Sequence, residues 1–169
     1  RERLQWPHPP FEVPAAIRAG WDARTKGARW SAEWATLMER YRGEFPELAA
    51  EFERRLRGEL PAEFAASANA FVSRLQAEGP AVASRKASQM ALDALGPLLP
   101  ELVGGSADLA HSNLTLWKAS KSVATDDPDA NYVYYGVREF AMTAISNGLA
   151  LHGGFIPFDA TFLVFSDYA

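Results

Sequence analysis

Cysteine is absent from the 169 residues of this chain. Its absence excludes a disulfide framework and any thiolate metal site, and it leaves the redox compartment open. The chain also lacks an excess of positive charge, since 17 Lys and Arg residues face 21 Asp and Glu residues and the formal net charge is −4. Without a basic surface to attract a phosphodiester backbone, nucleic acid is not an expected partner.

Long apolar runs are missing as well. No stretch approaches the roughly 20 apolar residues of a membrane-spanning helix, so no membrane partner is expected and a cytoplasmic location is the default prediction. The start of the chain, Arg1 to Leu4, has neither an initiator Met nor a signal-peptide apolar region, and the apolar run at 161–169 stops without a cap. We therefore expect both ends to lie inside a longer polypeptide.

Several catalytic motifs are missing too. The sequence has no nucleophile elbow, Walker loop or dinucleotide fingerprint, which leaves hydrolase, kinase and dehydrogenase readings without supporting residues. His8, His111 and His152 have neither i, i+4 spacing nor a carboxylate partner in register. No metal ligand is predicted within the chain.

Residues 1–80 are predicted to form a proline-rich connector followed by helices. Four prolines within residues 6–14 remove backbone donors and fix φ, which favours an extended segment. Three segments with apolar residues at helical spacing follow, and Ser31 is placed to cap the first of them. These helices are expected to run from Ser31, from Pro46 to Gly58 and from Pro61 to Gly79.

The pattern changes near residues 79–83, where we place a domain boundary. Strands and helices then alternate, which predicts a parallel sheet covered by helices, with ligands outside the carboxyl ends of the strands. Ser84 is placed to cap the first helix. The expected elements are a helix at 84–96, strands at 102–103 and 132–135, a helix at 138–151, a strand at 155–158 and a helix from Ala160.

Three features of this second part are candidates for chemistry, each with a plainer alternative. Gly104 and Gly105 could bring backbone N–H groups close to a ligand or form a tight turn. Glu139, at the start of a helix, could be catalytic or could favour the helix dipole. Arg85 with Lys86 suits a phosphate group but also an ordinary solvated charge pair. The residues alone leave these alternatives open.

Eight short blocks, taken together and in order, resemble transketolases. The proline-rich segment and the helices before residue 80 resemble, more loosely, the region that joins the two cofactor domains of that family. The blocks are SRKASQ at 84–89, GPLLP at 96–100, GGSADLA at 104–110, SNLTLW at 112–117, NY at 131–132, YGVREF at 135–140, LHGGF at 151–155 and TFL at 161–163.

The resemblance implies an α/β fold of the thiamin diphosphate-binding type, with an incomplete parallel sheet flanked by helices and preceded by a helical connector. Residues 1–80 are expected to be the proline-rich connector and helical linker region. Residues 81–169 are expected to be the N-terminal part of the pyrimidine-binding domain. The parent protein is expected to be a homodimer with its active site at the subunit interface.

Transketolases transfer a two-carbon ketol group reversibly from a ketose phosphate to an aldose phosphate in the pentose phosphate pathway. They use thiamine diphosphate and a divalent cation, Mg or Ca. The resemblance implies this activity for the full-length parent, with sugar phosphates as substrates. Because the family's metal- and diphosphate-binding segment and catalytic histidines lie outside this chain, the isolated chain is expected to be inactive.

One catalytic residue is implied. Glu139 matches the glutamate that hydrogen-bonds N1′ of the aminopyrimidine and favours the imino tautomer that takes the C2 proton. For this role the carboxyl group must hold or share a proton near neutral pH, which an apolar environment favours. Val137, Phe140 and Met142 are expected to supply that environment, and Arg138 would oppose it if it pointed inward.

Five cofactor-binding positions besides Glu139 are implied. Phe162, Phe165 and Tyr168 match the aromatic wall against which the pyrimidine packs. Asp108 and Leu109 match positions that line the cofactor cleft.

Two substrate-binding positions are also implied. Arg85 and Ser112 match residues that hold the substrate phosphate through charge-assisted hydrogen bonds. His111 stands where relatives often carry proline, so the turn before Ser112 is expected to differ.

Two alternatives stay open. The parent could be a dihydroxyacetone synthase, the formaldehyde-using relative, because the residues that select the acceptor are absent. The chain could also be a non-catalytic cofactor-binding or interaction fragment of a split transketolase.

Overall fold

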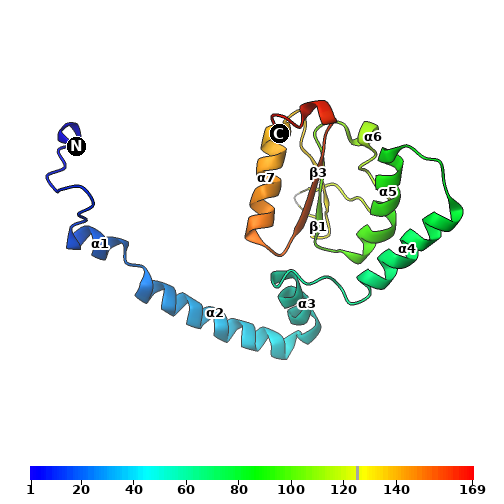
Figure 1. Ribbon diagram of the computed structural model, residues 1–169. Helices are drawn as coiled ribbons and strands as arrows, with labels where there is room; N and C mark the ends of the chain where they lie inside the picture. The colour runs from blue at the N-terminus through cyan, green and yellow to red at the C-terminus, as the bar shows by residue number, and fades with distance from the viewer. Residues whose placement is uncertain (125) are drawn as a thin grey trace. The chain divides into compact units, whose positions relative to one another are not determined.

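A computed structural model describes residues 1–124 and 126–169, which form two compact units, residues 1–50 and 51–169 (Figure 1). The first unit contains a short 3-10 helix, η1 (Glu2–Leu4), and the helices α1 (Ala15–Trp21) and α2 (Arg24–Glu44). Residues 6–14 contain no helix or strand, but the predicted extended segment is interrupted by a turn, in which Phe11 has φ 64° and the Glu12 N–H donates to the Pro9 carbonyl oxygen at 3.3 Å. Helix α1 was not predicted. None of the described helices combines the length and the apolar composition that a membrane span requires.

Helix α2 begins at Arg24, so the prediction that Ser31 starts and caps it was wrong. The side chain of Asp22 accepts a hydrogen bond from the Arg24 backbone N–H at 3.1 Å, which satisfies a free donor near the helix start. The following residues include Lys26, Ala28 and Arg29, all good helix formers. Ser31 therefore lies inside the helix.

The next two helices end where glycine was predicted to end them. Helix α3 (Pro46–Leu56) is followed by Gly58 with φ 67°, and α4 (Phe64–Glu78) by Gly79 with φ 55°. Glycine adopts this left-handed conformation without a Cβ clash, which allows the chain to leave the helix.

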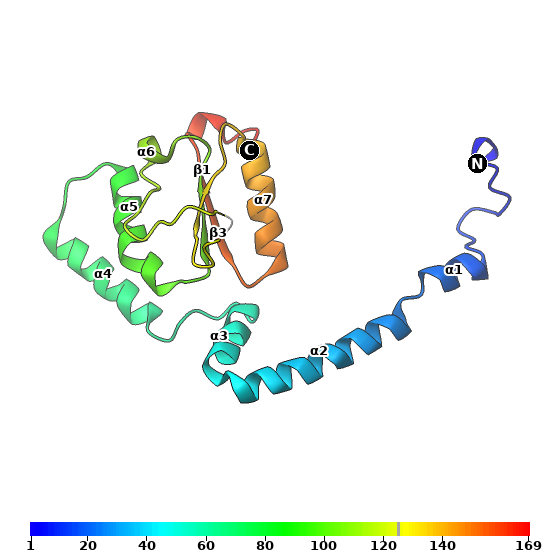
Figure 2. The ribbon, with the colours of Figure 1, turned by 180° about the vertical axis from the view of Figure 1, so that it is seen from behind.

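The second unit contains a three-stranded parallel sheet in the order β2-β1-β3. Its strands are β1 (Leu102–Ser106), β2 (Tyr132–Tyr134) and β3 (Ile156–Ala160). Helix α5 (Ser84–Leu95) covers one face and α7 (Glu139–His152) the other, as Figures 1 and 2 show from opposite sides. The predicted α/β fold with a helix-covered parallel sheet is thus confirmed. The remaining short helices are η2 (Gly96–Leu98), α6 (Ala110–Asn113) and η3 (Leu163–Phe165).

The core is divided between the two faces of the sheet. On the α5 side, Leu99, Leu102 and Trp117 are buried together, and Phe64 of α4 packs against them. On the α7 side, the buried cluster is Ala107, Tyr135 and Met142.

Strand β1 runs through Gly104 and Gly105, so neither the predicted short strand nor a tight turn describes this segment. A Cβ on Gly104 would lie 1.8 Å from the backbone oxygen of Phe158, and one on Gly105 would lie 1.9 Å from that of Val133. The glycines are therefore explained by the close approach of the two neighbouring strands.

Two other local predictions were wrong. Ser84 is the first residue of α5 rather than its cap, and its side chain makes no capping hydrogen bond. Ala160 ends β3 rather than beginning a helix. It pairs with Ser106, and its carbonyl oxygen accepts from the Ala107 N–H at 3.1 Å, so the sheet extends to this residue. Only the short η3 follows.

Candidate functional site

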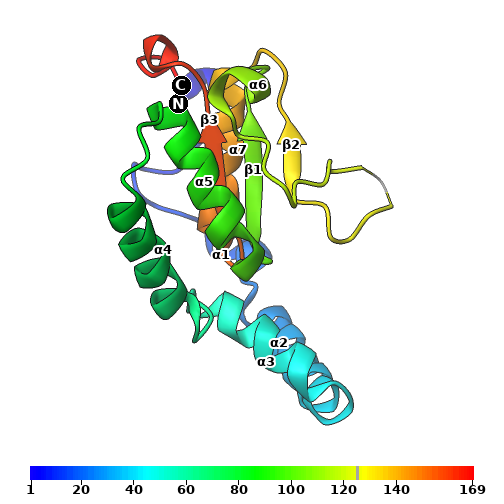
Figure 3. The ribbon, with the colours of Figure 1, turned by 90° about the vertical axis from the view of Figure 1, so that its right-hand side faces the viewer.

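The predicted site residues lie at one end of the sheet, outside the carboxyl ends of the strands. Helix α6, η3 and the first turns of α5 and α7 are all found at this end, and two views at right angles agree (Figures 1 and 3). Parallel strands produce this arrangement because each strand leads into its connection at the same edge. The residues concerned are Arg85, Asp108, Leu109, Ser112, Glu139, Phe162, Phe165 and Tyr168.

Glu139 is a buried carboxylate in the first turn of α7, with 7% of its surface exposed. The neighbouring Arg138 does not neutralise it, because Nη1 of Arg138 donates instead to the Tyr135 carbonyl oxygen at 2.9 Å. In the described part of the chain, no basic side chain forms an ion pair with Glu139. A buried carboxylate without a cation is costly unless another group compensates for its lost hydration.

The apolar environment of Glu139 differs from the prediction. Val137 and Phe140 are 74% and 71% exposed, so they do not bury it within this chain. The helical spacing explains this, because Phe140 and Met142 lie about 200° apart around α7. Met142 faces the core and is 1% exposed.

The aromatic segment lies beside Glu139. The rings of Phe162 and Phe165 are stacked, with centroids 6.3 Å apart and planes at 16°, and the Phe165 and Tyr168 centroids are 6.0 Å apart. The pKa of Tyr168 is raised, first by the desolvation of its hydroxyl group and then by the adjacent carboxylate of Glu139. The structure therefore brings Tyr168 and Glu139, 29 positions apart in the sequence, to one place.

Of the other predicted residues at this end, Leu109 is half-buried and Arg85, Asp108 and Ser112 are exposed. Asp108 has φ 57° directly after β1, and Ser112 lies in α6. Arg85 is in the first turn of α5. Neither Arg85 nor Ser112 has a hydrogen bond or ion pair of its side chain within the described residues, so both groups are free to meet a ligand.

Three polar residues at this end were not predicted. Ser106 donates a hydrogen bond to the Ala160 carbonyl oxygen at 3.0 Å, and the Asn113 amide donates to Ser106 Oγ at 3.3 Å. The hydroxyl of Thr161, next to Phe162, is buried without a partner in the described chain. The only sequence signal that pointed to these three residues was their position in the blocks GGSADLA, SNLTLW and TFL, which resemble transketolases.

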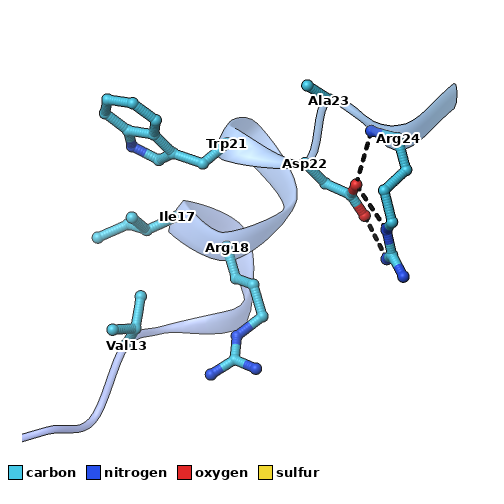
Figure 4. A pocket seen from close by; sticks show the side chains of 7 residues that line it. All are labelled: Val13, Ile17, Arg18, Trp21, Asp22, Ala23 and Arg24. Atoms are coloured by element: carbon cyan, nitrogen blue, oxygen red, sulfur yellow. Dashed lines mark hydrogen bonds and ion pairs between the residues drawn. The ribbon is translucent and has the colours of Figure 1, made fainter. Parts of the chain in front are cut away.

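A surface hollow of about 870 Å³ lies elsewhere, on α1 (Figure 4). Val13, Ile17 and Trp21 line it, and the ion pair of Asp22 with Arg24 stands at its side. None of the predicted site residues lines this hollow.

The family model described as "Transketolase, pyrimidine binding domain" matches residues 80–169, more than half of the chain. This chain belongs to the transketolase family. A second transketolase model, of the "thiamine diphosphate binding domain", matches residues 1–61. The division of the chain into a connector at 1–80 and a domain at 81–169 stays a prediction.

Curated transketolases match over the whole chain. "Transketolase 1" of Vibrio parahaemolyticus is 57% identical over 169 residues, which are 100% of this chain and 26% of that protein. "Transketolase 1" of Pasteurella multocida is 57% identical over 170 residues, 100% of this chain and 25% of that protein. The chain thus spans about a quarter of the length of the curated transketolases it matches.

Solved transketolases share the fold. The Pichia stipitis enzyme in complex with sedoheptulose 7-phosphate has a TM-score of 0.78 at 36% identity, covering 94% of this chain and 24% of that one. The Leishmania mexicana transketolase has a TM-score of 0.74 at 37% identity, covering 96% and 24%.

The described residues fit the pyrimidine part of thiamine diphosphate. They provide a buried acid without a cation, Glu139, an unpartnered buried hydroxyl, Thr161, and the stacked pair of Phe162 and Phe165. Such groups suit a flat heteroaromatic ring with polar edges. Among the described residues, no cluster of three or more His, Asp or Glu could hold a metal ion.

Proposed function

We propose that this chain is part of a transketolase that transfers a two-carbon ketol group reversibly between a ketose phosphate and an aldose phosphate in pentose phosphate metabolism. The observation that carries the proposal is Glu139, a carboxylate 7% exposed and without a cationic partner in the described chain. It stands outside the carboxyl ends of the parallel strands, where ligands bind in open sheets of this kind.

Glu139 is the proposed catalytic residue. When bound, thiamine diphosphate supplies the carbon nucleophile that a ketol transfer requires. The carboxyl group of Glu139 would hydrogen-bond N1′ of the aminopyrimidine, and its burial at the start of α7 beside Tyr168 supports this role. Phe162, Phe165 and Tyr168 orient the ring by packing against it.

The remaining proposed roles concern the cleft and the substrate. Asp108 and Leu109 line the cofactor cleft from the loop after β1. Arg85 and Ser112 bind the substrate phosphate, for which a guanidinium and a hydroxyl with no other side-chain partner are suitable donors. The sugar phosphate bound to the Pichia stipitis relative supports this substrate class.

Further parts of the proposal depend on the longer protein. We propose that segments outside this chain bind a divalent cation, Mg or Ca. We also propose a cytoplasmic homodimer whose active site lies at the subunit interface. The chain's match to a quarter of its relatives' length supports an incomplete site within residues 1–169.

The test is a ketol-transfer assay on the native polypeptide, whose intact mass is first measured by mass spectrometry. We expect a mass several times 18.5 kDa and transfer from a ketose phosphate to ribose 5-phosphate that depends on thiamine diphosphate. Transfer to formaldehyde instead would support a dihydroxyacetone synthase. A mass near 18.5 kDa with cofactor binding but no transfer would support the split-fragment alternative.

A further inference from the structure

Ser106 joins three elements through its side chain. Its hydroxyl donates to the Ala160 carbonyl oxygen at 3.0 Å and accepts from Nδ2 of Asn113 at 3.3 Å. Ser106 is the last residue of β1, Ala160 the last of β3 and Asn113 the last of α6. One hydroxyl group therefore connects the segments that leave the two strands at the candidate site.

This connection is shielded from water, since Ser106 is 1% exposed. A serine hydroxyl has a single proton, and that proton is used toward Ala160, so the bond from Asn113 must be accepted at a lone pair. Donors and acceptors aligned in this way polarise one another, and the effect is larger where water is excluded. Both hydrogen bonds therefore depend on the same oxygen atom.

Each end of the connection adjoins residues with a proposed role. Ser112 directly precedes Asn113, and both lie in α6, a helix of four residues that has little stability of its own. On the other side, Thr161 and Phe162 directly follow Ala160. A shift of Ala160 would move the unpartnered Thr161 hydroxyl and the stacked Phe162 ring together.

We propose that Ser106 is a positioning residue that holds the phosphate-binding turn through Asn113 and the pyrimidine-binding segment through Ala160. The inference rests on the proposed function, because it assigns a task to the scaffold of that site. The proposal implies that the Asn113 amide and the Ser106 hydroxyl have different effects on the site. Loss of the Asn113 amide loosens only the phosphate side. Loss of the Ser106 hydroxyl loosens both sides, although the Ala107 N–H still donates to the Ala160 carbonyl oxygen at 3.1 Å.

The experiment compares Asn113→Ala, Ser106→Ala and the double variant of the full-length protein. Calorimetry measures the Kd for thiamine diphosphate, and steady-state kinetics measures the KM for an aldose phosphate and for the same aldose without phosphate. Ser146→Ala is the matched control, because Ser146 is also a buried serine but lies within α7 and takes no part in the hydrogen bonds of Ser106.

Asn113→Ala is expected to raise the KM for the aldose phosphate about fivefold, as the loss of one neutral hydrogen bond predicts, with the other two constants within about twofold. Ser106→Ala is expected to raise both the aldose phosphate KM and the cofactor Kd about fivefold. The double variant is expected to match Ser106→Ala, because both bonds end on one oxygen.

Cofactor and substrate constants of Ser106→Ala equal to those of Ser146→Ala would overturn the proposal, as would additive losses in the double variant. If Ser106→Ala does not fold, the comparison of Asn113→Asp with Asn113→Ala tests the role of Ser106 instead. An aspartate accepts the Ser106 proton and draws it from Ala160, so the cofactor Kd should rise in Asn113→Asp and stay unchanged in Asn113→Ala. Equal values of Kd in these two variants would overturn the proposal.

The two hypotheses can fail separately. An unmodified protein that binds thiamine diphosphate but transfers no ketol group would contradict the proposed function, and the calorimetric comparison would still decide the role of Ser106. An unmodified protein that does not bind thiamine diphosphate would overturn both.

Discussion

Arg54 in α3 is held between two carboxylates, and removing it tests how α3 is attached to the sheet. Its Nη1 and Nη2 atoms donate to the two carboxylate oxygens of Glu101 at 2.8 and 3.0 Å, and its Nε donates to Glu51 at 2.7 Å. The Glu101 side chain is 4% exposed and that of Arg54 14%. Because Glu101 directly precedes β1, this bidentate pair ties the helix to the start of the central strand.

Replacing Arg54 by Ala leaves the Glu101 carboxylate buried without its cation. Breaking a buried ion pair from one side costs about 3–5 kcal/mol, mostly because the remaining charge stays desolvated. Arg57 is the matched control, since it pairs with Glu59 at 2.9 Å but its side chain is 54% exposed. Arg57→Ala is expected to have a much smaller effect, because solvent screens exposed pairs.

Native-state hydrogen exchange followed by mass spectrometry measures this difference in the full-length protein. At about 1.4 kcal/mol per tenfold change, amides at 51–59 should exchange at least about a hundredfold faster in Arg54→Ala. Exchange in Arg57→Ala should stay close to that of the unmodified protein. Equal exchange at 51–59 in the two variants would refute the reasoning.

Three further predictions follow from local geometry. Gly104→Ala should prevent normal folding, because its Cβ would overlap a backbone oxygen at 1.8 Å. Gly148→Ala, whose Cβ would have no atom within 4 Å, should stabilise α7 by about 0.5–1 kcal/mol. Thermal unfolding followed by circular dichroism compares the two variants. The side-chain hydrogen bond from Arg54 lowers the pKa of Glu51 from 4.5 to about 2. The contribution of Glu51 to stability is therefore complete above pH 4.5 and is lost as the pH falls toward 2. Hydrogen exchange of the amides at 51–59, measured across that pH range, would reveal this loss. Glu139→Gln should lower the raised pKa of Tyr168 toward 10, and an ultraviolet titration that finds no change would contradict their proximity.

Much of the fold was predictable because the signals are local. Glycine after an apolar helical stripe ends α3 and α4 at Gly58 and Gly79, and the alternation of strands and helices predicts the parallel sheet. Errors arose where a local signal competed with another. Ser31 is a good cap residue, but helix α2 begins seven residues earlier, at Arg24, where the Asp22 side chain accepts a hydrogen bond from the Arg24 backbone N–H. Gly104 suggested a turn, whereas the close approach of another strand explains it.

The site was predictable to a smaller extent. The strand-helix pattern predicts that Glu139 lies at the carboxyl edge of the sheet, but only the family resemblance gives it a chemical role. The hydrogen bonds of Ser106 could not be predicted, because its acceptor Ala160 is 54 positions away and the sheet register brings the two together. Likewise, the exposure of Phe140 depends on what covers α7, which no local pattern describes.

The role proposed for Glu139 is that of the catalytic residue of a ketol transferase. Its most direct test is the turnover number of Glu139→Ala in the full-length protein at saturating thiamine diphosphate, with cofactor binding checked by calorimetry. Glu47→Ala is the control, because Glu47 is also an acid in a first helical turn but is exposed. Turnover at least about a hundredfold below that of Glu47→Ala, with the cofactor still bound, is the predicted result. Turnover near that of the unmodified protein would contradict the claim.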